Sequence, residues 1–280
     1  MKYFLIDQDD LLHLEHVRLA KRAVDFQIWR GNTDVRLVSS LDDIRSDATL
    51  IVPVGSVEFV RSIFAMYSQV FFNENWPSDI RLDHFVQSRS WEYSSSPYKS
   101  LYTFGSCKLS EIDAAVKDFP IFIKPKFDST LFHGELLRDS TDLQSLYDLV
   151  VGVNGRQMDG NTEVYYSVPI NFIAEFRAII HNGKLLALSE YSVDETLPDP
   201  LKCLYDSKSV CYNKMFSGPY SILNTIDSSF ARIVDVGMPE QGVPAVVECA
   251  NNILTAATYT SFIDVVAYYK ALCSCGIKLI

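Results

Sequence analysis

The segment that decides the fold runs from residue 233 to residue 259 and reads Ile-Val-Asp-Val-Gly-Met-Pro-Glu-Gln-Gly-Val-Pro-Ala-Val-Val-Glu-Cys-Ala-Asn-Asn-Ile-Leu-Thr-Ala-Ala-Thr-Tyr. Two apolar runs of strand length, Ile233–Val236 and Ala245–Val247, stand on either side of a turn rich in glycine and proline. This pattern predicts an antiparallel hairpin. Each run carries one acid near its end, Asp235 in the first and Glu248 in the second.

These two acids are candidate ligands for a metal ion. A carboxylate in an apolar β segment is costly to bury unless a positive charge neutralises it, and a hard divalent cation such as Mg²⁺ is a natural partner. Asn251, three residues after Glu248, offers a neutral oxygen to the same shell. An ordinary hairpin with solvent-facing acids fits this stretch equally well, so both interpretations stay open here.

The bulk composition predicts a folded globular protein. The chain has 280 residues, enough for one large domain or two ordinary ones, and 48% of them are hydrophobic. Its formal net charge of -10 argues against a surface that binds nucleic acid by neutralising phosphates.

No apolar run approaches the roughly 20 residues needed to span a bilayer, and the N-terminus turns acidic where a signal peptide would stay apolar. We therefore expect a cytoplasmic protein without a membrane partner. The six cysteines are scattered and match neither a disulfide framework nor a paired zinc motif.

The first part of the chain alternates strand and helix patterns. Strands are expected at Lys2–Ile6, Val35–Val38 and Leu50–Val54, with helices over about residues 11–29 and 57–67. Such alternation predicts an open, mostly parallel α/β unit. The turn at Gly55 and Ser56 would then lie where anions or polar substrate groups meet free backbone N–H groups, although a plain strand-to-helix turn explains it as well.

A Ser/Pro-rich, aromatic interval over residues 76–100 is the best domain boundary. It predicts two domains, residues 1–100 and residues 101–280. A hydrophobic helix is expected at Ser261–Cys275, and it is compatible both with internal packing and with a homodimer.

The second part of the chain carries charged residues on strands. A short helix is expected over Lys108–Asp118. The apolar strand that follows contains Lys124, whose ammonium needs a partner if it points inward, and a nucleotide phosphate would be one. A later hairpin around Asn182-Gly183 places Glu175 and Arg177 on one strand face, either as a simple ion pair or as part of a phosphate and metal site.

The order of these parts resembles the ATP-grasp superfamily. The resemblance covers about residues 101–280, and Pro53–Val60 is similar to the pre-ATP-grasp domain of a short clade. The matching pieces are the strand Ile121–Pro125, the strand Val164–Ile170, the hairpin from Glu175-Phe176-Arg177 through Asn182-Gly183 to Tyr191, and Asp235-Val236-Gly237 with Val246-Val247-Glu248. The implied fold is an α/β N-terminal domain followed by an α+β ATP-grasp domain whose two lobes clamp a nucleotide.

The resemblance implies an ATP-dependent, ADP-forming ligase that activates a carboxylate as an acyl-phosphate for attack by an amine. Such phosphoryl transfer needs charge neutralisation and alignment more than a protein nucleophile. ATP and Mg²⁺ are the implied cofactors, and a carboxylate and an amine, small molecules or peptides, are the implied substrates.

The resemblance also assigns roles to residues. Lys124 and Arg177 would act on the transferred phosphate and are the catalytic candidates. The cofactor-binding candidates are Lys124, Lys126, Val164, Tyr165, Tyr166, Ser167, Glu175 and Arg177. The implied metal ligands are Asp235, Glu248 and Asn251.

The sequence departs from the family pattern at two places. The family usually has Glu-x-Asn, whereas Asn251 here comes one position late after Glu248, which would put it on the other strand face unless a bulge or the strand end intervenes. Thr130 stands where a second lysine is common, and Lys126 is the candidate substitute. A nucleotide-binding module without ligase activity is therefore an alternative, and a ligase acting on RNA or on a protein terminus is another.

Overall fold

The computed structural model of the chain describes residues 1–7, 15–68, 104–125, 134–149, 160–217, 221, 223, 231–240, 244–250, 253–254 and 265–279. The predicted aromatic linker and the positions Lys126, Thr130 and Asn251 lie outside these ranges.

The N-terminal part is a four-stranded sheet in the order β12-β3-β1-β2. Strands β1 (Lys2–Ile6), β2 (Val35–Val38) and β3 (Leu50–Val54) run parallel, as predicted and with the predicted bounds. The fourth strand, β12 (Ile277–Lys278), comes from the other end of the chain and pairs antiparallel with β3.

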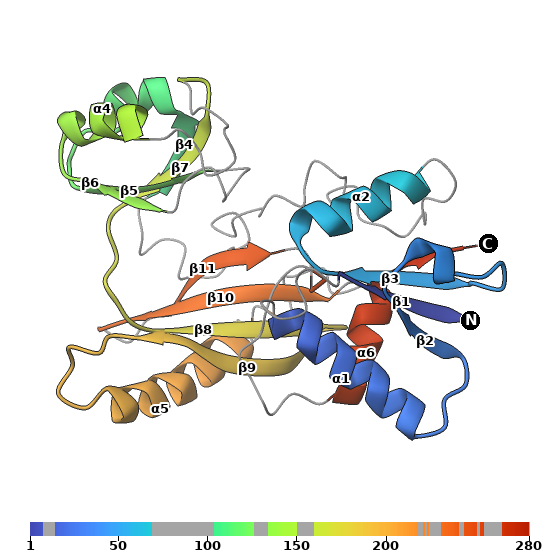
Figure 1. Cartoon of the computed structure of the whole chain (residues 1–280). Coiled ribbons are helices and arrows are strands. Elements are labelled where there is room, and N and C mark those ends of the chain that lie inside the picture. Colours follow the sequence, from blue (N-terminus) through green and yellow to red (C-terminus); the bar gives the residue numbers. More distant parts are fainter. Residues whose placement is uncertain are drawn as a thin grey trace.

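Helices cover both faces of this sheet. Helices α1 (Glu15–Trp29) and α6 (Val265–Ser274) lie together on one face, and α2 (Val57–Ser68) lies on the other (Figure 1). A short 3-10 turn, η1 (Leu41–Asp43), connects β2 to β3. The rings of Phe4 and Tyr269 stack with centroids 5.3 Å apart, so helix α6 packs internally on the N-terminal sheet. Whether two chains also pair stays open.

One hydrophobic core joins this sheet to the rest of the chain. It contains Ile179, Ile233 and Leu254 together with the apolar residues of β1, β3, α1 and α6. The predicted domain boundary at residue 100 lies outside the described residues, so the division into residues 1–100 and 101–280 stays a prediction. The C-terminal helix and strand nevertheless complete the N-terminal sheet.

The small lobe is a second four-stranded sheet, in the order β4-β7-β5-β6, with antiparallel pairing throughout. Its elements are β4 (Phe104–Lys108), η5 (Leu109–Glu111), α3 (Ile112–Ala115), β5 (Ile121–Pro125), β6 (Glu135–Leu137), α4 (Ser140–Leu149) and β7 (Glu163–Ser167). The helix predicted over Lys108–Asp118 is wrong in extent, because Lys108 ends a strand that pairs with β7 and only two short turns follow.

The large lobe is a third sheet, in the order β11-β10-β8-β9, also antiparallel. Its elements are β8 (Phe172–His181), β9 (Lys184–Val193), α5 (Pro200–Cys211), the π-helical turn η6 (Tyr212–Phe216), β10 (Arg232–Pro239) and β11 (Ala245–Ala250). The predicted Asn-Gly turn is confirmed: Asn182 has φ 51° and Gly183 φ 65°, the positive values that a tight hairpin turn requires.

The two faces of the large sheet differ in character. One face packs on α5 and η6, with Phe176, Val234, Val236 and Met215 buried in that core. The opposite face carries Glu175, Arg177 and Asp235, since residues two apart on a strand point the same way. Helix α5 was not predicted from the sequence. Among the described helices, none is both long and apolar enough to cross a membrane.

Candidate functional site

An ion pair on the open face of the large sheet is the centre of the candidate site. Arg177 donates from Nε to Oδ1 of Asp235 and from Nη2 to Oδ2, both at 2.7 Å. The side chains are 15% and 7% exposed, so the pair is nearly removed from solvent. A two-pronged contact of this kind is the strongest geometry available to an arginine and a carboxylate. The sequence left open an ion pair between Glu175 and Arg177, and the ion pair described here joins Arg177 to Asp235.

Strand register places a third charged position beside this pair. Arg177 on β8 is the direct partner of Asp235 on β10, and Asp235 is in turn the direct partner of Glu248 on β11. The three positions therefore form one row across three adjacent strands. The predicted hairpin that brings the two acidic positions together is confirmed at the level of the backbone.

A pocket of about 320 Å³ lies next to this row, between the two lobes. Lys124, on β5 of the small lobe, and Glu175, on β8 of the large lobe, both line it. Glu175 precedes Arg177 by two residues, or about 7 Å along the strand. The complete lining is Phe122, Lys124, Ser167, Ile170, Asn171, Phe172, Glu175 and Val247. Small-molecule sites start at about this volume and combine apolar walls with a few polar groups.

Two phenylalanine rings contribute to the apolar wall of the pocket, beside Ile170 and Val247, and each ring lies against a glycine. A Cβ on Gly134 would overlap the ring of Phe122, and a Cβ on Gly237 would overlap the ring of Phe172. Gly237 is also the direct strand partner of Glu175. Both rings therefore occupy space that any other residue at the two glycine positions would take.

The small lobe turns only some of the predicted nucleotide contacts toward the pocket. Lys124 pairs with Tyr165 across β5 and β7, and Phe122 pairs with Ser167, so these four side chains share a face. Val164 lies in the core of the small lobe, on the other face. Tyr166 shares that other face, and a Cβ on Gly105 would overlap its hydroxyl end.

Of the four register irregularities in the described strands of the large sheet, two are bulges beside the Arg177–Asp235 row. On the β10–β11 pair, Asp235 is opposite Glu248 but Val236 is opposite Val246, which leaves Val247 as the extra residue. On the β8–β9 pair, Phe176 is opposite Glu190 but Glu175 is opposite Ser192, which leaves Tyr191 as the extra residue. Bulges change the direction of side chains and occur often next to functional sites.

The second bulge places an aromatic ring on the arginine. The ring of Tyr191 lies with its centroid 4.5 Å from Cζ of Arg177, within the range of a cation–π contact. The sequence analysis quoted Tyr191 only as the end of a strand and missed this contact. Strand patterning shows alternation, but it does not show where a ladder will gain an extra residue.

The first bulge bears on the predicted metal ligands. It lies before Glu248, and the pairing is regular from Glu248 to Ala250, where β11 ends. The irregularity that would bring Asn251 to the same face as Glu248 is therefore not within β11, and Asn251 itself lies outside the described residues. Among the side chains that the structure describes, no three His, Cys, Asp or Glu residues gather as metal ligands. The metal site stays a prediction.

The edge of the N-terminal sheet also approaches the large lobe. The hydroxyl of Ser56 donates to Oδ2 of Asp7 at 3.2 Å, and the N–H of Gly55 donates to the carbonyl of Leu254 at 3.2 Å. The Ser56 oxygen accepts from the backbone N–H of Phe59 and so caps helix α2. The predicted polar turn thus lies against residues that follow β11.

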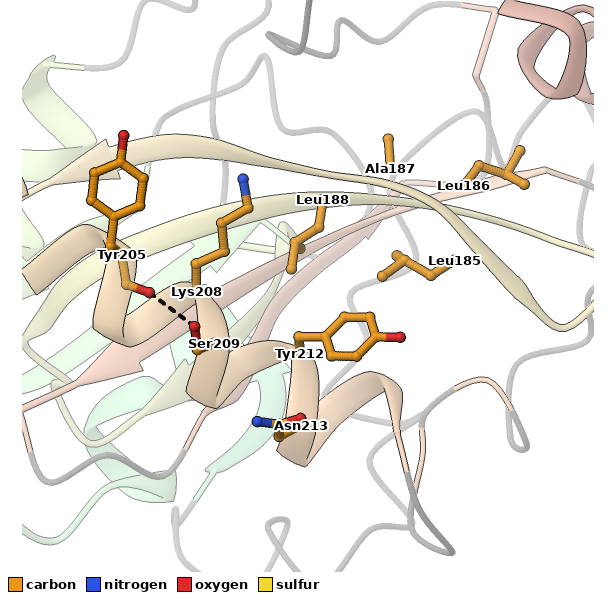
Figure 2. A pocket seen from close by; sticks show the side chains of 9 residues that line it. All are labelled: Leu185, Leu186, Ala187, Leu188, Tyr205, Lys208, Ser209, Tyr212 and Asn213. Atoms are coloured by element: carbon orange, nitrogen blue, oxygen red, sulfur yellow. Dashed lines mark hydrogen bonds between the residues drawn. The ribbon is translucent and has the colours of Figure 1, made fainter. Parts of the chain in front are cut away.

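A larger cavity, about 580 Å³, lies elsewhere, between β9 and helix α5 (Figure 2). Leucines and tyrosines dominate its wall, and none of the predicted site residues reaches it. Burial alone would raise the pKa of the Glu190 carboxyl, but the hydrogen bond from Lys208, a backbone hydrogen bond and the charge of Lys208 together outweigh this effect, and the net pKa is lowered. The charge of Lys208 is therefore already paired, and we place the site in the smaller pocket between the lobes.

Comparison with known proteins identifies a matching family. Residues 103–271 match the family model described as ATP-grasp domain, R2K clade family 2. No curated protein matches the chain.

Three solved structures have similar folds. They are N5-carboxyaminoimidazole synthetase from Staphylococcus aureus complexed with ADP (TM-score 0.54, 11% identity, 98% of this chain and 77% of that one), an ATP-grasp RimK domain protein from Sphaerobacter thermophilus (0.55, 16%, 98% and 99%), and N5-carboxyaminoimidazole synthase from Aspergillus clavatus with ADP and 5-aminoimidazole ribonucleotide (0.54, 9%, 97% and 76%). At these identities the similarity extends to the fold.

Proposed function

Because this chain belongs to the ATP-grasp domain family of R2K clade family 2, we propose that it is an ATP-dependent ligase joining a carboxylate to an amine. The carboxylate oxygen attacks the γ-phosphorus of ATP, and ADP leaves. The amine nitrogen then attacks the carbonyl carbon of the acyl-phosphate and phosphate leaves, while the nitrogen gives up a proton to solvent. The products are an amide, ADP and phosphate.

The observation that carries this proposal is the nearly buried Arg177–Asp235 pair. Arg177 lies two residues along β8 from Glu175, which lines a pocket between two sheets. A cation fixed in a place of low solvent access stabilises developing phosphate charge without having to reorganise. Arg177 is thus suited to neutralise the γ-phosphate and the acyl-phosphate.

The pocket supports the binding of the rest of the nucleotide. We assign Lys124, with Lys126 from the segment that follows β5, to the phosphates, and Glu175 to the polar part of the ligand. The backbone of Val164, Tyr165, Tyr166 and Ser167 is assigned to the adenine edge. The rings of Phe122 and Phe172 offer flat apolar walls of the kind on which a base packs.

The oxygen donors in the row fit a magnesium ion. Asp235 is buried with its charge balanced by Arg177, and the direct strand partner of Asp235 is a glutamate. Hard cations of this kind prefer carboxylate and amide oxygens. We propose Asp235, Glu248 and Asn251 as its ligands. When bound, the ion would neutralise charge on the transferred phosphate.

A second candidate function is nucleotide binding without ligation. The regular pairing from Glu248 to Ala250 favours it, because a strand that continued in register would turn Asn251 away from Glu248. The two candidates differ in products: the ligase releases ADP and an amide, whereas the binding module retains Mg-ATP with every acid and amine offered.

Calorimetric titration with a non-hydrolysable ATP analogue, with and without Mg²⁺, tests the proposal. We expect micromolar, Mg²⁺-dependent binding that is lost in Glu248→Ala. Asp25→Ala, which removes an exposed acid on helix α1, is the matched control and should bind as the wild type does. Absence of binding at millimolar analogue would refute the proposed function. Binding should be followed by a screen of acids and amines for ADP release.

A further inference from the structure

The arginine of the candidate site is held by two different groups on two different strands. Asp235, on β10, takes the Nε and Nη2 edge of the guanidinium, and Tyr191, on β9, covers its face. The carboxylate fork restrains the edge of the planar group but leaves rotation about the line joining Arg177 and Asp235. A ring lying on the face opposes that rotation.

Ordinary core packing does not account for the position of Tyr191. The residue is 44% exposed, and it belongs to none of the buried clusters. Its neighbours Glu190 and Ser192 pair with Phe176 and Glu175, which are consecutive on β8. Tyr191 is therefore the extra residue of a bulge. Without the bulge, Tyr191 would be the direct partner of Glu175. The irregularity therefore alters the placement of this ring relative to Arg177.

We propose that Tyr191 is a positioning residue that fixes the plane of the Arg177 guanidinium and thereby directs its N–H groups to the terminal phosphate of a bound nucleoside triphosphate. This inference rests on the function proposed above and adds a residue to it. The aromatic face is the part of the side chain that the contact uses, so phenylalanine fulfils the role and leucine does not.

The terminal phosphate provides a readout that simple structural damage would not reproduce. Arg177 is assigned to the γ-phosphate, which ADP lacks, so loss of its orientation weakens a triphosphate and spares a diphosphate. We expect Tyr191→Leu to reduce the affinity for a non-hydrolysable ATP analogue by about 2- to 30-fold, the range of one cation–π contact. ADP affinity should stay within about twofold of the wild type, because the Tyr191–Arg177 contact orients a guanidinium that is assigned to the γ-phosphate, and ADP has no γ-phosphate.

The experiment is calorimetric titration of wild type, Tyr191→Leu and Tyr191→Phe with the Mg²⁺ complexes of the ATP analogue and of ADP. Thermal unfolding of each variant confirms that it is folded. Tyr205→Leu, which truncates a 67% exposed tyrosine on helix α5, is the matched control and should leave both affinities unchanged. Tyr191→Phe should retain the affinity of the wild type for both ligands.

Three results would overturn the inference. An unchanged analogue affinity in Tyr191→Leu, beside normal binding by the wild type, would overturn it alone. An equal loss for the analogue and for ADP, or an equal loss in the leucine and phenylalanine variants, would show a merely structural role. Failure of the wild type to bind either nucleotide would instead overturn the proposed function, and this inference with it.

Discussion

Replacing Arg177 by methionine isolates the role of the buried ion pair. The substitution leaves Asp235, which is 5% exposed, without the two hydrogen bonds that balance its charge. Its direct strand partner on the other side is another acidic residue, at position 248, which adds no compensating cation. Breaking a buried pair by removing one partner costs about 3 to 5 kcal/mol of unfolding free energy. In a chain of this size that corresponds to a melting temperature lower by about 5 to 9 °C.

The same variant tests the proposed metal ligands without requiring activity. If Asp235 and position 248 can hold Mg²⁺, the ion supplies the missing positive charge in Arg177→Met. A ligand at 100 times its dissociation constant stabilises the folded state by about 2.7 kcal/mol, so millimolar Mg²⁺ should recover several degrees. In the wild type Arg177 already balances Asp235, so Mg²⁺ without nucleotide should change the melting temperature much less.

Thermal unfolding followed by circular dichroism, with and without Mg²⁺, measures both effects. Lys208→Met is the control, since it removes an ion pair whose side chains are 35% and 40% exposed. Exposed pairs contribute about 0 to 1 kcal/mol, so this variant should melt close to the wild type. The reasoning would be refuted if Arg177→Met were no less stable than Lys208→Met. Equal Mg²⁺ shifts in all three proteins would refute the metal ligands specifically.

Two further predictions use other parts of the fold. Gly237→Ala places a Cβ in the space of the Phe172 ring and should cost about 1 to 3 kcal/mol of unfolding free energy. Because the displaced ring lines the pocket, calorimetry should also show a lower nucleotide affinity. Gly31→Ala, at a turn glycine with nothing near its Cβ, should leave that affinity unchanged. Burial lowers the pKa of His181, so the folded state disfavours its charged form. The resulting stability is present above about pH 6.5 and is lost as the pH falls through the lower folded-state pKa. Chemical unfolding across this range should show a smaller pH dependence in His181→Gln.

Much of the fold followed from local patterns in the sequence. The strands β1, β2 and β3 have the predicted bounds. Strands β1 and β3 are short apolar runs, which are typical of a parallel strand buried on both faces, whereas β2 lies at the sheet edge and carries the exposed Arg36. The turn at Asn182-Gly183 was predictable because those two residues tolerate positive φ. Helix α5 was missed. Its N-cap, Asp199, directly precedes a proline at the first helical position, and that start signal is visible in the sequence.

In the candidate site, too, the features set by local patterns were predictable and those set by long-range pairing were not. Alternation along a strand showed that Glu175 and Arg177 share a face, and the acids of the hairpin showed which positions would meet across it. The pairing of Arg177 with Asp235 depends on the register between two strands 58 residues apart in the chain, which no local pattern specifies. Lys124 was singled out as a cation on an apolar strand, but its approach to Glu175 depends on how two lobes meet.

The bulges explain why the remaining part of the site resisted prediction. Each bulge adds one residue to one strand, close to the Arg177–Asp235 row. Val247 is the extra residue just before position 248, the direct partner of Asp235. Tyr191 is the extra residue two positions after Ser189, the direct partner of Arg177. A side chain at a bulge leaves the strict alternation from which a sequence assigns faces. Val247 thereby comes to line the pocket. Tyr191 keeps the face of Ser189, but the bulge frees it from a direct strand partner, and its ring lies over the guanidinium. Deleting either extra residue would restore a regular ladder with the same partners on both sides, and it would remove the side chain that the bulge adds to the site. Such a deletion should therefore damage the site while the residues of the hydrophobic core keep their faces.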